Sequence, residues 1–311
     1  MPAQTKKRVE DYIMPLNMNG LQGRMLHMPA PKRYAGREFL VIYGHHALLE
    51  RWWGLALNFN DYGAVTMPDL PGFGGMDSFY RIGKKPTIDN FADYLAAFIK
   101  LRYKRKRVMV VGISFGFVVI TRMLQRYPEL AKNVDVVVSM VGFMHRDDFL
   151  FKPFNRKLYS AATKVCATRP VAFVIRYGWL NGFTIRTLYR CLPLGRRRFA
   201  DMQPSEFRVM IDFDVYLWQA NDVRTHWATT SEFLQIDNCT RPINLPVWHI
   251  ASMNDYYFNN QIVKEHMLVV FNSYTEAYFN SKAHTPGIMS DKKELGIMLP
   301  KSIRKLLSQA P

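Results

Sequence analysis

The sequence predicts an α/β protein with a mostly parallel sheet, helices on both faces and a helical cap inserted after the sixth strand. Short β-branched apolar runs alternate with helical stretches along most of the 311 residues. This alternation is typical of a parallel sheet covered by helices. Between residues 146 and 240 it gives way to an aromatic-rich stretch with helical spacing. We therefore expect a core formed by residues 1–145 and 241–311 and a cap formed by residues 146–240.

The expected elements follow in order along the chain. Asn19-Gly20 separates the first two strands, and an Asn-Gly pair is a strong signal for a tight hairpin. The expected strands are 9–16, 21–28, 39–43, 64–67, 108–111, 134–141, 247–252 and 273–279. The expected helices outside the cap are 48–58, 88–101, 117–124, 261–270 and 292–308.

A G-x-S-x-G pentapeptide at residues 112–116 joins the fifth strand to the helix that follows it. A strand, a sharp turn and a helix form the context of a nucleophile elbow, in which a strained backbone lifts the serine hydroxyl off the sheet. The glycines two residues on either side leave room for that turn, and the helix N-terminus favours negative charge near the hydroxyl. The motif therefore predicts Ser114 as a nucleophile.

A serine hydroxyl needs a histidine to take its proton, and the histidine needs a carboxylate to fix its tautomer. Asp255 follows the strand at 247–252, and His284 follows the strand at 273–279. Both are expected at the carboxyl edge of the sheet, where Ser114 emerges. Asp147 and Asp148 follow the sixth strand and are rival acids, but Asp255 is the favoured one.

Seven other histidines compete with His284. His249 lies inside a strand and is expected in the core, whereas His45 and His46 follow the third strand and are expected near the mouth of a pocket. The remaining four lack the position expected of the base; they are His27, His145, His226 and His266.

With its nucleophile, acid and base in this order, the chain resembles the α/β-hydrolase superfamily, in the serine-nucleophile branch with a helical cap that includes esterases, lipases and lactonases. The resemblance covers about residues 10–308 and includes Asp-Leu-Pro-Gly-Phe-Gly at residues 69–74, similar to the D-x-x-G-x-G loop of the family. Asp77 replaces the third glycine of a dinucleotide fingerprint, so that interpretation is rejected.

The resemblance implies an oxyanion hole formed by the backbone N–H groups of Phe115 and His45. The chain departs from the family pattern at two positions: Tyr43 replaces the usual histidine before the oxyanion loop, and Ala283 replaces the common glycine before the catalytic histidine. The first departure bears on the structure of that loop, and the second is a mild change.

The implied activity is hydrolysis of carboxylic esters through an acyl-enzyme, with no cofactor or metal. Small or lipid-like apolar acyl esters are the favoured substrates, and His46, Trp179 and Trp218 are candidates to line the pocket. One alternative is a lactonase of the acyl-homoserine-lactone type that uses the same triad. The other is a ligand-binding receptor of the same fold without turnover.

The net charge of +17 and the pI of about 9.8 allow a weak association with an anionic membrane surface. The densest basic clusters lie at residues 104–107 and 196–198, and no nucleic-acid-binding motif accompanies them, so nucleic acid is not an expected partner. No secretory signal or membrane-spanning run is recognisable. Three cysteines without metal-ligand spacing fit a reduced, cytoplasmic protein.

Overall fold

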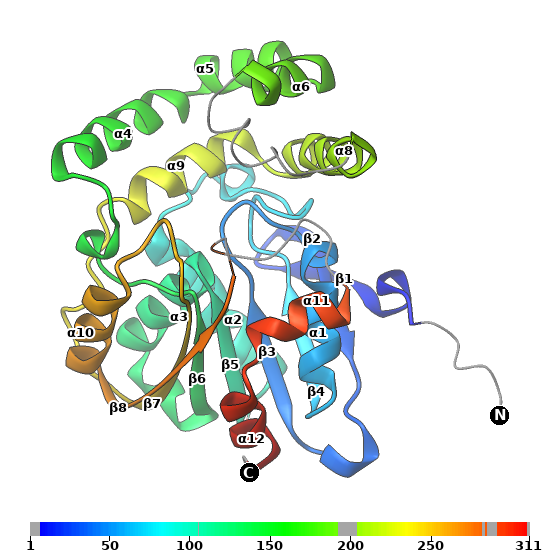
Figure 1. The fold of residues 1–311 in the computed structure, drawn as a ribbon, viewed down its shortest axis with the longest axis vertical. Coiled ribbons are helices and arrows are strands. Elements are labelled where there is room, and N and C mark those ends of the chain that lie inside the picture. Colours follow the sequence, from blue (N-terminus) through cyan, green and yellow to red (C-terminus); the bar gives the residue numbers. More distant parts are fainter. Residues whose placement is uncertain (1–6, 105, 192–203, 282–283, 285–290, 310–311) are drawn as a thin grey trace.

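The computed structural model describes residues 7–104, 106–191, 204–281, 284 and 291–309. Its centre is an eight-stranded sheet with the order β1-β2-β4-β3-β5-β6-β7-β8 (Figure 1). β1 pairs antiparallel with β2, and β2 pairs antiparallel with β4, while all later neighbours are parallel. The strands are β1 Ile13–Met18, β2 Leu21–Met28, β3 Glu38–Ile42, β4 Ala64–Pro68, β5 Val108–Ile113, β6 Val134–Met140, β7 Ile243–Ser252 and β8 Phe271–Phe279.

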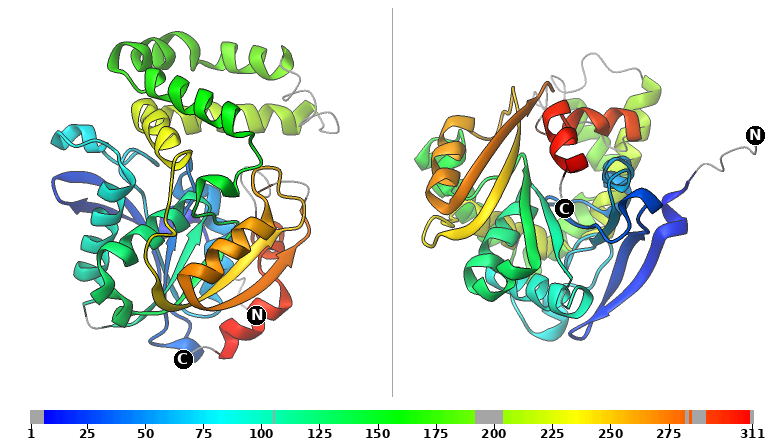
Figure 2. Two further views of the ribbon diagram at one scale, coloured as in Figure 1. Left: turned by 90° about the vertical axis from the view of Figure 1, so that its left-hand side faces the viewer. Right: turned by 90° about the horizontal axis from the view of Figure 1, so that it is seen from below.

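Helices cover both faces of this sheet, as expected (Figure 2). One face carries α2, α3 and α10, and the other carries α1, α11 and α12. These helices are α1 Trp53–Asn60, α2 Ile88–Arg102, α3 Phe115–Arg126, α10 Asn260–Val270, α11 Lys292–Leu295 and α12 Lys301–Gln309. None of the described helices is long and apolar enough to cross a bilayer.

Between β6 and β7, the longer described elements are helices, and they lie above one end of the sheet (Figure 1). The helices α8 and α9 lie nearer the sheet, and α4, α5 and α6 lie beyond them. These elements are α4 Pro153–Cys166, α5 Arg169–Val174, the π-helix η7 Ile175–Trp179, α6 Gly182–Cys191, α8 Pro204–Ala220 and α9 Val223–Phe233. We refer to them as the cap helices, and the domain boundaries at 146 and 240 stay a prediction.

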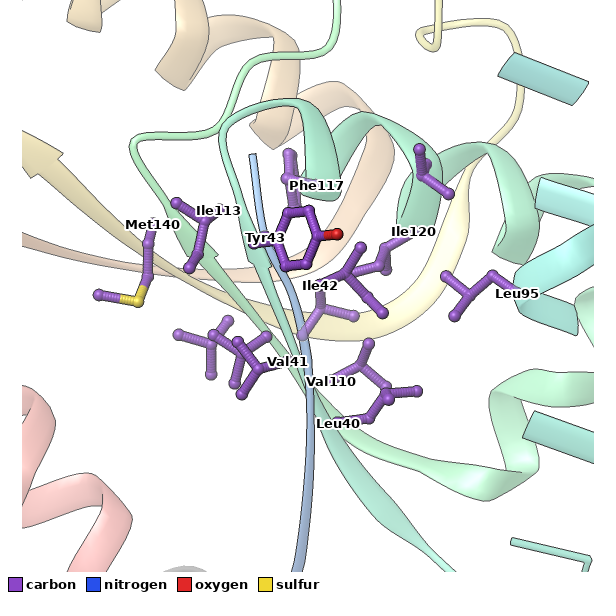
Figure 3. Close-up of a cluster of buried hydrophobic side chains, with 14 of the residues drawn as sticks. Leu40, Val41, Ile42, Tyr43, Leu95, Val110, Ile113, Phe117, Ile120 and Met140 are labelled. Carbon is purple, nitrogen blue, oxygen red and sulfur yellow. The ribbon is translucent and has the colours of Figure 1, made fainter. Parts of the chain in front are cut away.

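The core forms where the central strands meet the helices of one face (Figure 3). The side chains of Leu40 and Ile42 on β3 pack with Val110 on β5 and with Phe117 and Ile120 on α3, and all five are fully buried. Central parallel strands are covered on both faces, which is why their sequences are continuously apolar rather than alternating. This packing fixes the position of the turn between β5 and α3.

Two expected elements are wrong in detail. Residues 9–12 form a 3-10 helix, Val9–Tyr12, rather than the start of β1, and the Asp11 carboxylate accepts a hydrogen bond from the Arg8 backbone. The expected helix 292–308 is broken into α11, a 3-10 turn and α12. Pro300 disfavours helical backbone at the residue before it, and Leu299 accordingly has φ −113° and ψ 84°.

His249 predicts a measurable acid sensitivity of the fold. Its ring is buried on a face of the sheet, and its Nδ1 lies 2.9 Å from the Oγ of Ser139 on the neighbouring strand. Burial lowers the pKa of His249 from 6.5 to about 4. The unfolded chain therefore binds this proton more readily, so stability is lost as the pH falls below 6.5 towards 4. We expect this histidine alone to remove about 2 kcal/mol of unfolding free energy between pH 7 and pH 5.

The measurement is urea unfolding of the wild type and of His249→Asn across this pH range. The variant should show a shallower decline of stability with acid, whatever its stability at pH 7. Parallel pH profiles for the wild type and His249→Asn would contradict the assignment.

Candidate active site

Ser114 occupies the sharp turn between β5 and α3 with φ 50° and ψ −115°. Positive φ is costly for a residue with a side chain, so the surroundings must hold this conformation in place. Its backbone N–H donates to the Met140 carbonyl at 2.9 Å. A Cβ at Gly112 would lie 2.5 Å from the Phe117 Cα, and one at Gly116 would collide with the end of β3. Both flanking glycines are therefore required by close backbone contact.

The structure brings Ser114, His284 and Asp255 together. His284 Nε2 lies 3.1 Å from Ser114 Oγ, and His284 Nδ1 lies 2.6 Å from Asp255 Oδ2. The side chains of Asp255 and His284 are only 2% and 10% exposed, so their interaction is shielded from water. In this geometry Nδ1–H donates to the carboxylate, and Nε2 is free to accept the proton of the serine hydroxyl.

The loop after β7 orients the acid. Asp255 Oδ1 accepts hydrogen bonds from the backbone N–H groups of Tyr257 and Phe258, at 2.9 and 3.3 Å. The rings of the same two residues lie 5.3 and 5.2 Å from the His284 ring, with their edges or faces turned towards it. One short segment thus positions both the carboxylate and the imidazole.

The two backbone groups expected to form the oxyanion hole lie beside Ser114. Phe115 is the first residue of α3, so its N–H has no acceptor within the helix. His45 follows Gly44, and a Cβ at Gly44 would lie 3.4 Å from Ser114 Cβ, so the two loops are in contact. Within the described part of the chain, no acceptor takes either N–H. Their catalytic role stays a prediction.

The side chain of His45 fixes its loop to a cap helix. Its Nε2 lies 2.8 Å from the Thr229 hydroxyl and 3.2 Å from the His226 carbonyl, both on α9. Burial lowers the pKa of His45 to about 4, so the ring is neutral at neutral pH. The loop that carries the expected oxyanion donor is therefore held from the cap side.

Tyr43 holds the same loop from the core side. Its hydroxyl donates to Asp69 Oδ1 at 2.7 Å and accepts from the Leu70 backbone N–H at 3.1 Å. Asp69 is completely buried and also accepts from Arg24 Nε at 3.1 Å, and Arg24 pairs with Glu50 at 2.7 Å. Arg24, Tyr43, Glu50 and Asp69, here called the Asp69 network, give a physical reason for the tyrosine at this position.

The D-x-x-G-x-G loop contacts the cap rather than open solvent. The Gly74 N–H donates to Asn221 Oδ1 at 2.7 Å, and the Asp222 N–H donates to the Gly72 carbonyl at 2.8 Å. Gly72 and Gly74 have φ of 85° and 62°, and a Cβ at Gly72 would lie 2.6 Å from the Thr225 hydroxyl. Gly72 therefore allows α9 to approach the loop closely, whereas Gly74 leaves room for the Asp69 carboxylate.

The rival acid Asp148 belongs to a different pair. Its Oδ2 accepts the backbone N–H groups of Met144 and His145 at 2.8 and 2.9 Å, and its Oδ1 lies 2.5 Å from His266 Nδ1. It is fully buried beneath α10 and braces the loop after β6. Asp147 instead pairs with Arg156 at 2.8 Å. Neither acid contacts His284.

The pocket candidates separate into two groups. His46 is partly buried, with its ring 4.0 Å from that of Trp218 on α8, and its Nδ1 accepts from Asn221 at 3.2 Å. Both lie at the junction of the oxyanion loop and the cap. Trp179 lies on η7 and is 61% exposed, and the structure does not bring it to this junction.

A group of aromatic rings lies beside the proposed triad; the sequence indicates Phe233 only as one of many cap aromatics and does not single out Phe143 or Phe258. Phe143 stacks on Phe258 at 4.6 Å, and Phe233 lies 5.9 Å from Phe143 and 5.1 Å from His45. Phe258 in turn contacts His284. The rings therefore form a continuous apolar path from the base to the oxyanion loop. Each of these phenylalanines lies at or after the end of a strand or helix. Phenylalanines at such places are too common for the sequence to single them out.

Some expectations have no counterpart among the described residues. Ala283 and the basic cluster at 196–198 lie outside them. Within the described residues, no group of three or more His, Cys, Asp or Glu side chains is arranged to hold a metal ion.

Comparison with known proteins places the fold. No family model and no curated protein matches the sequence. Solved structures with high similarity include the N-formylmaleamic acid deformylase Nfo of Pseudomonas putida S16, at TM-score 0.62 and 16% identity over 92% of this chain and 98% of that one. The esterase EaEST of Exiguobacterium antarcticum matches at TM-score 0.64 and 12% identity, over 93% of this chain and 96% of that one.

An enol-lactonase from Burkholderia xenovorans LB400 matches at TM-score 0.59 and 12% identity, over 85% of this chain and 90% of that one. These matches extend over 85–93% of this chain. The chain therefore has the α/β-hydrolase fold, as the sequence predicts.

The Asp69 network predicts the effect of Tyr43→Phe. Removing the hydroxyl leaves a buried carboxylate oxygen and the Leu70 N–H without a partner, which should cost about 1–3 kcal/mol of unfolding free energy. Urea unfolding is the measurement, and Tyr62→Phe is the matched control because it removes a partly buried hydroxyl outside the network. Equal loss in the two variants would show that the network does not stabilise this loop.

Proposed function

We propose that this protein is a serine hydrolase that cleaves carboxylic esters with apolar acyl groups. The observation that carries the proposal is the position of His284, hydrogen bonded to Ser114 on one side and to Asp255 on the other. A nucleophile, a base and an orienting acid in contact are the components of acyl transfer to serine. The strained turn at Ser114 supports the same reaction, as do the two N–H groups beside it that meet no acceptor among the described residues.

In the proposed reaction, Ser114 Oγ attacks the ester carbonyl while His284 Nε2 takes its proton. The negative charge that develops on the carbonyl oxygen is stabilised by the N–H groups of Phe115 and His45, which are preorganised and need not rotate during the step. His284 then protonates the leaving alcohol, and an acyl-Ser114 ester remains. Water, deprotonated by His284, attacks this ester and releases the carboxylic acid. These steps require no metal or cofactor.

The surroundings of the triad favour an apolar acyl group. Phe143, Phe233 and Phe258 surround the route between His284 and the oxyanion loop, and all are buried or partly buried. Burial also lowers the pKa of His45, His46 and His226, so these rings add no positive charge to the site at neutral pH. An uncharged acyl chain fits this environment better than an anionic one.

A lactone is the second candidate substrate. Its ring ester would open by the same steps, with the alcohol remaining on the acyl group, and one of the similar structures is an enol-lactonase. The choice between an open ester and a lactone depends on the space available beside Phe115 and Phe233, which assays on both classes will measure.

Hydrolysis of p-nitrophenyl esters of increasing acyl length is the first test. We expect turnover in the wild type, and a loss of at least about 10⁴-fold in Ser114→Ala because the nucleophile is gone. Hydrolysis of an N-acyl-homoserine lactone, assayed in parallel, tests the lactonase alternative. Equal rates for the wild type and Ser114→Ala on both classes would contradict a hydrolase and favour the receptor alternative, for which ligand binding to Ser114→Ala is the corresponding test.

Asp255→Asn and Asp148→Asn distinguish the two acids. Replacing Asp255 removes the acceptor that fixes the His284 tautomer, and kcat should fall about 10⁴-fold. Replacing Asp148 disturbs the His266 pair and should lower the unfolding midpoint while leaving kcat near that of the wild type. Steady-state kinetics and thermal unfolding of both variants are the measurements. A larger kcat loss in Asp148→Asn would reverse the assignment.

A further inference from the structure

The cap helix α4 is turned with its apolar side outward. Phe154, Leu158 and Val165 are spaced so that they lie on one side of the helix, and they are 76%, 59% and 59% exposed. The opposite side carries Ser160 and Thr163, which are buried. An amphipathic helix of a globular protein normally shows the reverse arrangement. The packing of α4 against the protein therefore leaves its own apolar side uncovered.

The buried side of α4 forms a polar contact with α9 that accounts for this orientation. Ser160 Oγ lies 3.2 Å from Ser231 Oγ and accepts a hydrogen bond from Gln235 Nε2 at 2.6 Å. These groups are satisfied only if α4 presents its serine to α9. Specific hydrogen bonds thus fix the outward direction of Phe154, Leu158 and Val165.

Large apolar side chains are also exposed on the neighbouring cap helices. Phe173 on α5, Trp179 on η7 and Phe183 on α6 are 63%, 61% and 80% exposed. Figures 1 and 2 show that α4, α5 and α6 form the layer farthest from the sheet. We call these three residues, with Phe154, Leu158 and Val165, the outer cap face. Exposed large apolar side chains in such number mark an interaction surface.

The charge of the same stretch is one-sided. Residues 149–200 contain eleven Lys and Arg and no Asp or Glu. Lys157 and Lys164 lie on α4 beside the apolar side, and Arg169 begins α5; all three are exposed. In the part of the chain that the structure describes, none of these three forms an ion pair. The outer cap face thus combines aromatic and aliphatic groups with uncompensated positive charge.

We propose that the outer cap face binds the surface of an anionic phospholipid bilayer. Bulky apolar side chains flanked by Lys and Arg are the composition of helices that lie in the membrane interface, where the apolar groups enter the acyl boundary and the cations contact anionic headgroups. A second copy of this chain would meet the face with the same positive charge and be repelled. A nucleic acid would match the charge but would leave Leu158 and Val165 exposed to water.

This inference goes beyond the proposed hydrolysis and does not depend on it. Bilayer binding would place the cap between the membrane and Ser114, because α8 and α9 lie between the outer cap face and the sheet. The test therefore measures binding in the Ser114→Ala protein as well as in the wild type, and the two should bind equally.

Co-sedimentation with vesicles is the experiment. We expect binding to vesicles of equimolar phosphatidylcholine and phosphatidylserine, little binding to pure phosphatidylcholine, and weakening with added salt. The double variant Lys157→Gln/Lys164→Gln should bind about 30-fold more weakly, at about fivefold for each charge. Its matched control is Lys301→Gln/Lys305→Gln, which removes two exposed lysines from α12 at the far end of the molecule and should bind like the wild type.

The apolar contribution has its own pair of variants. Phe154→Ser/Leu158→Ser should lose most of the binding, whereas Leu268→Ser/Val269→Ser, which alters two exposed apolar residues on α10, should retain it. All four positions are exposed, and thermal unfolding checks that each protein is folded. Unchanged binding in Phe154→Ser/Leu158→Ser, or equal binding to both kinds of vesicle, would overturn the proposal. So would a stable dimer that these two substitutions dissociate, because the face would then be a contact between copies.

Discussion

The close crossing of the β5–α3 turn over the end of β3 is the constraint on which the site depends. Gly116 leaves no room for a side chain next to the Ile42 carbonyl, and Gly44 brings the next loop against Ser114. The packed core beneath, from Leu40 to Phe117, keeps this crossing from relaxing. The positive φ of Ser114 is therefore maintained by packing around it, and the same packing positions both the proposed nucleophile and the expected oxyanion donors.

The loop after β3 is held from two directions by different chemistry. On the core side Tyr43 joins it to the buried carboxylate of Asp69, and on the cap side His45 joins it to Thr229. The position of the expected donor N–H thus depends on cap and core together. Neither contact is local in sequence, since Asp69 lies 26 residues from Tyr43 and Thr229 lies 184 residues from His45.

The features encoded by local sequence were predictable, and those that depend on distant partners were not. The turn at Ser114 follows from the glycines around it, and the approach of Asp255 and His284 follows from their places after successive parallel strands. The Tyr43–Asp69 bond joins the residues that directly follow β3 and β4, and nothing beside Tyr43 indicates it. The spacing of Phe154 and Leu158 gives an apolar stripe but does not say which way it faces, because Ser160 finds its partners on α9.

The chain enters and leaves the cap helices through two segments that are themselves paired. The Arg146 N–H donates to the Ile236 carbonyl, and the Asn238 N–H donates to the Met144 carbonyl, at 2.8 and 2.9 Å. The insertion therefore begins and ends at one place on the sheet, and a change in its length or sequence need not shift any strand. Evolution can consequently alter the cap helices and the surface that they form while the residues around Ser114 are inherited unchanged.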